Sequence, residues 1–383
     1  MDLSKVTLDI FSKLEQKWLS PRKTRILSID GGGTTAIVAG ASIVHLEDQI
    51  RLQTGDPHAQ ISDFFDIVAG TGIGGILAAL LVADDGSGRP MFTARDAVKF
   101  IAELFEIRHG GVFRRNRRRY SGSSMDRVLE AAFRRREDGK VLTMKDTCKP
   151  LLVPCYDLKS SAPFVFSRAG ALESPSFDFE LWKVCRATSA TPSLFKPVNV
   201  VSVDGKTSCL AVDGGLVMNN PTAAALTHVL HNKRDFPSVN GVDDLLVLSL
   251  GNGSSSSSPG KKLRGDCSTT SCVVDIVLDG VSDTVDQMLG NAFCWNHTDY
   301  VRIQVSGLTS GGEESVRARK TADELLNERG VETAPFGGKR LLSETNGERI
   351  KSFVQRLVSS GKSTSLPPSP CKESAVNPLA HGR

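Results

Sequence analysis

The stretch Phe64-Phe-Asp-Ile-Val-Ala-Gly-Thr-Gly-Ile-Gly-Gly75 decides the fold. An apolar run over residues 64–69, rich in β-forming residues, ends in a cluster of glycines. The apolar residues 76–82 that follow are long enough to continue as a helix. The pattern therefore predicts a strand, a tight turn and a helix, the basic unit of an α/β fold.

Two functional motifs fit this turn, and a glycine-rich turn without a ligand is the third possibility. In a nucleophile elbow, G-x-S-x-G, a strained turn lifts a serine above the sheet. Here the frame is Gly70-Thr-Gly-Ile-Gly74, and Gly72 occupies the serine position. In a dinucleotide fingerprint, G-x-G-x-x-G, a second strand ends in an acid about twenty residues further on. Asp84 and Asp85 instead follow in a loop with no strand before them, which argues against a dinucleotide site.

A second glycine cluster follows the first predicted strand, Arg25-Ile-Leu-Ser-Ile-Asp30, and precedes a helical pattern over residues 37–46. Gly31, Gly32 and Gly33 expose backbone N–H groups at a helix N-terminus, a geometry that binds a phosphate or a developing oxyanion. No G-K-[ST] closes this loop, so it is not a P-loop.

The remaining pattern continues the α/β alternation. Strands are predicted over residues 151–157, 164–166, 198–203, 209–212, 244–250 and 300–305, and helices over 93–107, 125–133, 180–187, 222–230, 273–293, 322–326 and 340–357. The strand at 209–212 ends at Asp213-Gly214-Gly215. Open α/β sheets place their functional groups at the carboxyl ends of strands, so Asp213 is a candidate acid.

Composition limits the possible partners. The chain has 383 residues, with 47 basic and 43 acidic side chains, which gives no reason to expect nucleic acid as the main partner. The eight cysteines form no C-x-x-C pair, and the seven histidines lack metal spacing, so we expect reduced thiols and no metal or other cofactor. Charged residues interrupt any signal-peptide core near the N-terminus, and no long apolar run exists. The expected location is therefore cytoplasmic, not secreted.

Two segments are candidates for contact with a membrane surface. Residues 1–23 have the apolar spacing of an amphipathic helix, which either docks on the domain or lies on a membrane with Trp18 at the interface. The cluster of Arg114, Arg115, Arg117, Arg118 and Arg119, with a second cluster at 134–136, is either a solvated cationic face or a site for anionic headgroups. Each basic residue near such a surface contributes about 1 kcal/mol. No aromatic residues alternate with the arginines, so nucleic acid is disfavoured. Residues 359–383 are predicted to be a disordered Ser/Pro-rich tail.

In order along the chain, the motifs resemble those of the patatin-like phospholipase family, the plant lipid acyl hydrolases. The motifs are Asp30-Gly-Gly-Gly33, Gly70-Thr-Gly-Ile-Gly-Gly75, Tyr156-Asp157, Arg186-Ala-Thr-Ser-Ala-Thr-Pro192, Asp213-Gly-Gly215 with Asn219-Asn-Pro221, and Leu248-Ser-Leu-Gly251. The resemblance implies one domain over residues 24–358, with a three-layer α/β/α fold and a mostly parallel central sheet. It also implies a Ser–Asp dyad that requires no calcium.

Carried over by position, the resemblance makes Asp213 the general base and the N–H groups of Gly31, Gly32 and Gly33 the oxyanion donors. Two departures stand out. The nucleophile position is Gly72, and the glycine loop continues as Thr-Thr-Ala rather than x-Arg-Gly. The chain resembles a plant subgroup with a G-x-G-x-G elbow, whose members are regarded as lipid acyl hydrolases.

Gly72 has no side chain that attacks an ester, so a covalent acyl-enzyme at this position is excluded. Asp213 remains able to activate a water molecule in the space that the missing side chain leaves. Enzymes without their nucleophile keep roughly 10³–10⁴-fold catalysis over water. Thr71 and Ser189 are weaker candidate nucleophiles, and Asp213 also fits a purely structural turn. We therefore expect a slow hydrolase of membrane glycerolipids, phospholipids or galactolipids. The alternative is a lipid-binding or signalling scaffold that has lost the chemistry.

Overall fold

The computed structural model describes residues 23–32, 36–109, 122–192, 194–252, 270–305, 322–334 and 338–359. Three predictions therefore fall wholly or almost wholly outside the described residues: the N-terminal helix at 1–23, the arginine cluster at 114–119 and the tail at 359–383. Gly33 also lies outside them. The limits of the domain stay a prediction.

A mostly parallel eight-stranded sheet forms the centre of the described fold. Its strand order is β5-β6-β3-β2-β1-β7-β8, and β4 pairs with β3. The strands are β1 Thr24–Ile29, β2 Ile67–Gly70, β3 Leu151–Asp157, β4 Ala162–Ser167, β5 Val198–Val201, β6 Ser208–Asp213, β7 Leu245–Leu250 and β8 Tyr300–Ile303. The neighbours β3, β2, β1, β7 and β8 pair in parallel, whereas β4, β5 and β6 are antiparallel to their partners.

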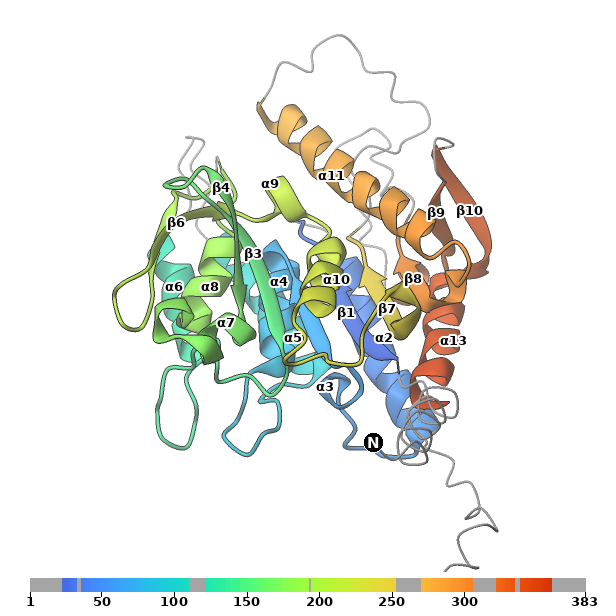
Figure 1. Ribbon diagram of the computed structural model, residues 1–383, viewed down its shortest axis with the longest axis horizontal. Helices are drawn as coiled ribbons and strands as arrows, with labels where there is room; N and C mark the ends of the chain where they lie inside the picture. Colours follow the sequence, from blue (N-terminus) through green and yellow to red (C-terminus); the bar gives the residue numbers. More distant parts are fainter. Residues whose placement is uncertain are drawn as a thin grey trace, which may run out of the picture.

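Helices cover both faces of this sheet (Figure 1). They are α2 Ala36–Thr54, α3 Ile61–Phe64, α4 Gly72–Val82, α5 Ala94–His109, α6 Gly122–Ala132, α7 Arg168–Glu173, α8 Leu181–Thr188, α9 Gly215–Met218, α10 Thr222–His231, α11 Thr270–Ala292, α12 Ala322–Asn327 and α13 Asn346–Ser359. Short 3₁₀ turns lie at Pro175–Phe177, Val242–Asp244 and His297–Asp299.

The central strands are apolar on both sides because both sides are buried. On β1, Ile26 packs with α10 and the end of α11, whereas Leu27 and Ile29 pack with α2, α4, α8 and α13. On β7, Val247 and Leu248 alternate in the same way between the two cores. Continuous apolar strands of this kind are typical of parallel sheets with helices on both faces. The three-layer α/β/α prediction is confirmed.

The register of the parallel strands brings their carboxyl ends to one edge. Ile29 at the end of β1 pairs with Gly70 of β2 and with Leu250 of β7. The glycine loop after β1 and the elbow after β2 therefore leave the sheet side by side. Ligand sites of open α/β sheets lie at this edge.

Two predicted elements were partly wrong. The strand predicted over 64–69 begins only at Ile67, because residues 61–64 form the short helix α3, where the carboxylate of Asp63 caps the N–H of Gln60. The helix predicted over 340–357 begins only at Asn346. Before it, β10 Gly338–Thr345 pairs with β9 Arg329–Ala334 in a hairpin outside the main sheet. A capping box between Thr345 and Glu348 sets the start of this helix.

Candidate active site

The elbow after β2 is built as a nucleophile elbow without its nucleophile. Gly72, the first residue of α4, has φ +56°, in the left-handed region that favours glycine. Its N–H donates to Thr188 Oγ1 at 2.9 Å. A Cβ built on Gly72 would lie 3.5 Å from Gly31 Cα, 3.7 Å from Asp213 Oδ1 and 3.8 Å from Gly32 N. A side chain at this position would therefore start between the acid and the glycine loop, in ordinary van der Waals contact with both.

Close packing of glycines holds the elbow against β1. A Cβ on Gly74 would clash with the backbone oxygens of Ile29 and Asp30, and a Cβ on Gly70 would clash with the backbone of Gly74. Helix α4 thus begins closer to the end of β1 than any residue with a side chain permits. This approach places Gly72 beside the glycine loop.

Asp213 ends β6, and its carboxylate is held by two donors. Thr191 Oγ1 donates to Oδ2 at 2.7 Å, and the Gly215 N–H donates to Oδ1 at 2.8 Å. Burial raises the pKa of Asp213 above its ordinary value of 3.8, while the two hydrogen bonds oppose that rise. The side chain remains partly accessible. Oδ1 is the carboxylate oxygen that faces position 72.

The segment after α8 joins the elbow to the acid. Thr188 receives the Gly72 N–H and donates its own hydroxyl to the Pro154 carbonyl at 2.7 Å. Thr191, three residues later, holds Asp213. The sequence contains both threonines in the run Arg186-Ala-Thr-Ser-Ala-Thr-Pro192, but nothing in that run alone assigns them these partners.

The glycine loop is fixed from two sides. The Gly31 N–H donates to the Asn219 carbonyl at 2.8 Å. The Asn252 side-chain amide donates to the carbonyls of Asp30 and Gly31 at 2.7 and 2.9 Å. Because the Gly31 amide is already engaged, Gly32 is the described glycine best placed to face an oxyanion at position 72. The oxyanion role of the loop stays a prediction.

The two alternative nucleophiles have other partners. Thr71 is fully buried, and its hydroxyl donates to the Met218 carbonyl at 2.7 Å. The Ser189 hydroxyl donates to the Cys185 carbonyl at 2.7 Å, within the last turn of its helix. Both hydroxyls therefore stabilise backbone rather than face the site.

Other predicted contacts are only partly described. In the second arginine cluster, Arg134 pairs with Glu130 at 2.8 Å and Arg135 with Asp138 at 3.2 Å, which neutralises part of this face. Within the described ranges, no group of three or more His, Cys, Asp and Glu side chains is arranged to hold a metal ion. No helix in that same part of the chain is both long and apolar enough to cross a bilayer.

Gly31, Gly32, Gly72 and Asp213, here called the elbow site, form in this α/β fold the surroundings of a nucleophile elbow without the nucleophilic side chain. The family model for patatin-like phospholipase matches residues 27–226. The chain belongs to the patatin-like phospholipase family.

Relatives of known name agree with this assignment. The chain is 84% identical over 395 aligned residues, 100% of both chains, to "Probable inactive patatin-like protein 9" of Arabidopsis thaliana. It is 43% identical to "Patatin-like protein 6" of the same plant, over 88% of this chain and 71% of that protein. It is 38% identical to "Patatin-like protein 3" of Oryza sativa subsp. japonica, over 92% of this chain and 90% of that protein.

Proposed function

We propose that this protein binds acyl lipids at a hydrolase site from which covalent chemistry has been lost. One observation carries the proposal: a Cβ at Gly72 would fit between Asp213 Oδ1 and Gly32 N, at 3.7 and 3.8 Å, without a clash. The surroundings of a nucleophile are thus present while the nucleophile is absent. The name of the relative that is 84% identical, which includes the word inactive, supports this proposal.

The proposed ligands are membrane glycerolipids, either phospholipids or galactolipids. The description of the matching family, a phospholipase, supports this class. A lipid ester carbonyl placed at position 72 would lie beside the Gly32 N–H, where hydrolases place the donors of an oxyanion hole. Without a serine, the ester would be held and not cleaved by acyl transfer.

Photocrosslinking tests where the lipid lies. The wild-type protein is mixed with vesicles of phosphatidylcholine and digalactosyldiacylglycerol, a small fraction of which carries a diazirine near the ester end of one acyl chain. The expected crosslinks fall on the peptides that contain Gly31 and Gly32, Gly72 or Asp213. Crosslinks confined to other peptides, or none above a vesicle-free background, would refute binding at the elbow site.

A second candidate function is slow hydrolysis by a water molecule that Asp213 activates. The retained carboxylate, with donors on both oxygens and with Oδ1 directed at position 72, supports it. Fatty-acid release by wild type and by Asp213→Asn separates the two candidates. Release by wild type that is lost in Asp213→Asn identifies the hydrolase. Equal release by both proteins, at the rate of vesicles alone, leaves lipid binding as the function.

Peripheral membrane contact on the cytoplasmic side is part of this proposal. The support is the sequence alone, since Arg114, Arg115, Arg117, Arg118 and Arg119 lie outside the described residues. Sedimentation with anionic vesicles tests it, with a variant in which these five arginines are glutamates. An electrostatic contact weakens at high salt and in that variant, whereas binding unchanged by both would refute it.

A further inference from the structure

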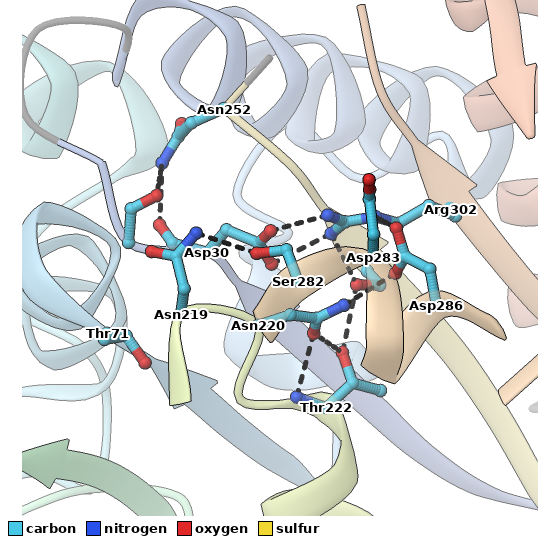
Figure 2. Close-up of polar contacts among 12 residues, drawn as sticks. Asp30, Thr71, Asn219, Asn220, Thr222, Asn252, Ser282, Asp283, Asp286 and Arg302 are labelled. Atoms are coloured by element: carbon cyan, nitrogen blue, oxygen red, sulfur yellow. Dashed lines mark hydrogen bonds and ion pairs between the residues drawn. The ribbon is translucent and has the colours of Figure 1, made fainter. Parts of the chain in front are cut away.

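A buried cluster of charged residues includes Asp30, the residue that precedes the glycine loop (Figure 2). Its centre is Arg302 on β8, which is only 6% exposed. Two nitrogens of its guanidinium donate to the two oxygens of Asp30, Nη1 at 2.8 Å and Nη2 at 2.5 Å. Nη1 also donates to Ser249 Oγ on β7 at 2.9 Å. Asp30 is the residue immediately before Gly31, so this pair fixes the base of the glycine loop.

The same guanidinium reaches a second carboxylate on α11. Arg302 Nε donates to Asp286 Oδ2 at 3.2 Å. The other oxygen of Asp286 accepts from Asn220 Nδ2 at 2.7 Å and from the Tyr300 hydroxyl at 3.2 Å. One arginine thus connects the glycine loop with the turn that contains Asn220, although these segments are far apart in the sequence.

The turn at Asn219 and Asn220 is itself part of the elbow site's frame. It follows α9, the helix that begins two residues after Asp213. The Asn219 carbonyl accepts the Gly31 N–H, and its side-chain amide donates to Ser282 of α11 at 2.7 Å. Helix α11 therefore holds this turn through Ser282 and Asp286, and the turn holds Gly31.

We propose that Arg302 is a positioning residue, which through Asp30 and Asp286 sets the glycine loop and the Asn219–Asn220 turn in register with each other. Docking of α11 then controls both sides of the elbow site at once. Only the effect of this positioning on lipid binding or turnover rests on the proposed function. The positioning itself concerns the structure of the loop.

The burial of this ion pair supports a positional role for Arg302. Ion pairs removed from water often give no net stability, because the desolvation of both charges offsets their attraction. Burial raises the pKa of Asp30 to about 6, whereas the carboxylates of Asp286 and Asp30 hold the pKa of Arg302 above its ordinary value, so the arginine stays charged in the buried cluster. What the pair supplies is a fixed geometry: a guanidinium offers planar donors that a lysine ammonium does not.

The same strand offers a matched control. At the opposite end of β1, Arg25 makes a similar two-point pair with Asp66, with Nε to Oδ2 and Nη2 to Oδ1 both at 3.1 Å. That pair joins β1 to the start of β2, away from the elbow site. Its loss affects the stability of the same strand without touching the glycine loop.

Hydrogen–deuterium exchange tests the proposal on the full-length protein without any lipid. The variants are Arg302→Lys, Asp286→Asn and the control Asp66→Asn. In the first two, peptides that contain Gly31 and those that contain Asn220 should both exchange at least tenfold faster. In the control, both peptides should keep wild-type rates. Two results would overturn the proposal: unchanged exchange in Asp286→Asn and Arg302→Lys, or equal acceleration in Asp66→Asn.

A second measurement separates positioning from general destabilisation. Each variant is combined with Gly72→Ser, and release of fatty acid from phosphatidylcholine vesicles is followed. A positioning role lowers kcat at least tenfold with KM nearly unchanged, and Asp66→Asn changes neither. If the Gly72→Ser protein releases no fatty acid, the proposed geometry of the elbow site is wrong. The exchange experiment then still decides the role of Arg302.

Discussion

Replacing Gly72 by serine tests the elbow site most directly. The serine Cβ meets no atom closer than 3.5 Å, so the mutation adds no overlap. Its cost is the left-handed backbone at φ +56°, about 1–2 kcal/mol for a residue with a side chain. Serine has less backbone freedom than glycine in the unfolded chain, and this difference stabilises the folded protein by about 0.4–1 kcal/mol. The net destabilisation is about 1 kcal/mol, which lowers Tm by about 2–4 °C.

The gain in rate follows from what the serine would meet. In a serine hydrolase, removing the nucleophile costs about 10⁶-fold in kcat. The Gly31 N–H already donates to the Asn219 carbonyl, so it does not serve as an oxyanion donor. The absence of one such donor lowers kcat by about 10²–10³-fold. We therefore expect the Gly72→Ser protein to release fatty acid about 10³–10⁴-fold faster than wild type. The assay is fatty-acid release from phosphatidylcholine or galactolipid vesicles, with Tm measured on the same samples.

The double variant with Asp213→Asn is the control, because it keeps the serine and removes the base. Its rate should return to that of wild type. A folded Gly72→Ser protein, with Tm within a few degrees of wild type, that releases no more fatty acid than the double variant would refute the view that the elbow site preserves hydrolase geometry.

Three further outcomes follow from the same contacts. In the Gly72→Ser variant the rate of fatty-acid release should rise with pH as Asp213 ionises. Because burial raises the pKa of Asp213, the inflection should lie above the ordinary 3.8. A pH–rate profile measures this inflection, and a flat profile contradicts the prediction. Thr191→Val in that background removes a bond to the carboxylate worth about 1.5–3 kcal/mol, and the inflection should move to still higher pH. Gly74→Ala should destabilise the fold by about 3 kcal/mol in urea unfolding, since its Cβ meets backbone, whereas Gly241→Ala, with open space around it, should change little.

The sequence was sufficient to predict the strands and helices whose apolar residues form a continuous or periodic local pattern. The strands at 151–157 and 244–250 have continuous apolar runs because helices cover both faces of the sheet, and the structure places β3 and β7 there. Asp213 and the glycine loop were identifiable because they follow such strands directly. The order of the motifs associated Asp213 and the glycine loop with Gly72, but only the structure gives the distances between them.

Contacts between residues far apart in the chain could not be predicted. Arg302 and Asp30 are 272 positions apart, and neither belongs to a local pattern that specifies the other. The hairpin of β9 and β10 was missed because residues 340–345 alone do not distinguish a strand from the start of the helix that follows. The box formed by Thr345 and Glu348 was a usable signal for the true helix start.

The buried charges beside the elbow site limit which substitutions its frame tolerates. Burial raises the pKa of Asp30, Asp213 and Asp286, so each carboxylate is less stable when ionised in the fold than in water. For Asp30 the folded pKa of about 6 exceeds the ordinary 3.8, so its contribution to stability is fully present below about pH 4 and is lost as pH rises through about 6. Asp30 and Asp286 share the buried guanidinium of Arg302, so replacing either acid alone by a neutral residue would remove a partner of that buried charge, which costs about 3–5 kcal/mol. Under the proposed function, the fixed geometry that these contacts give to the frame of the elbow site would serve to orient a lipid ester, with or without its cleavage.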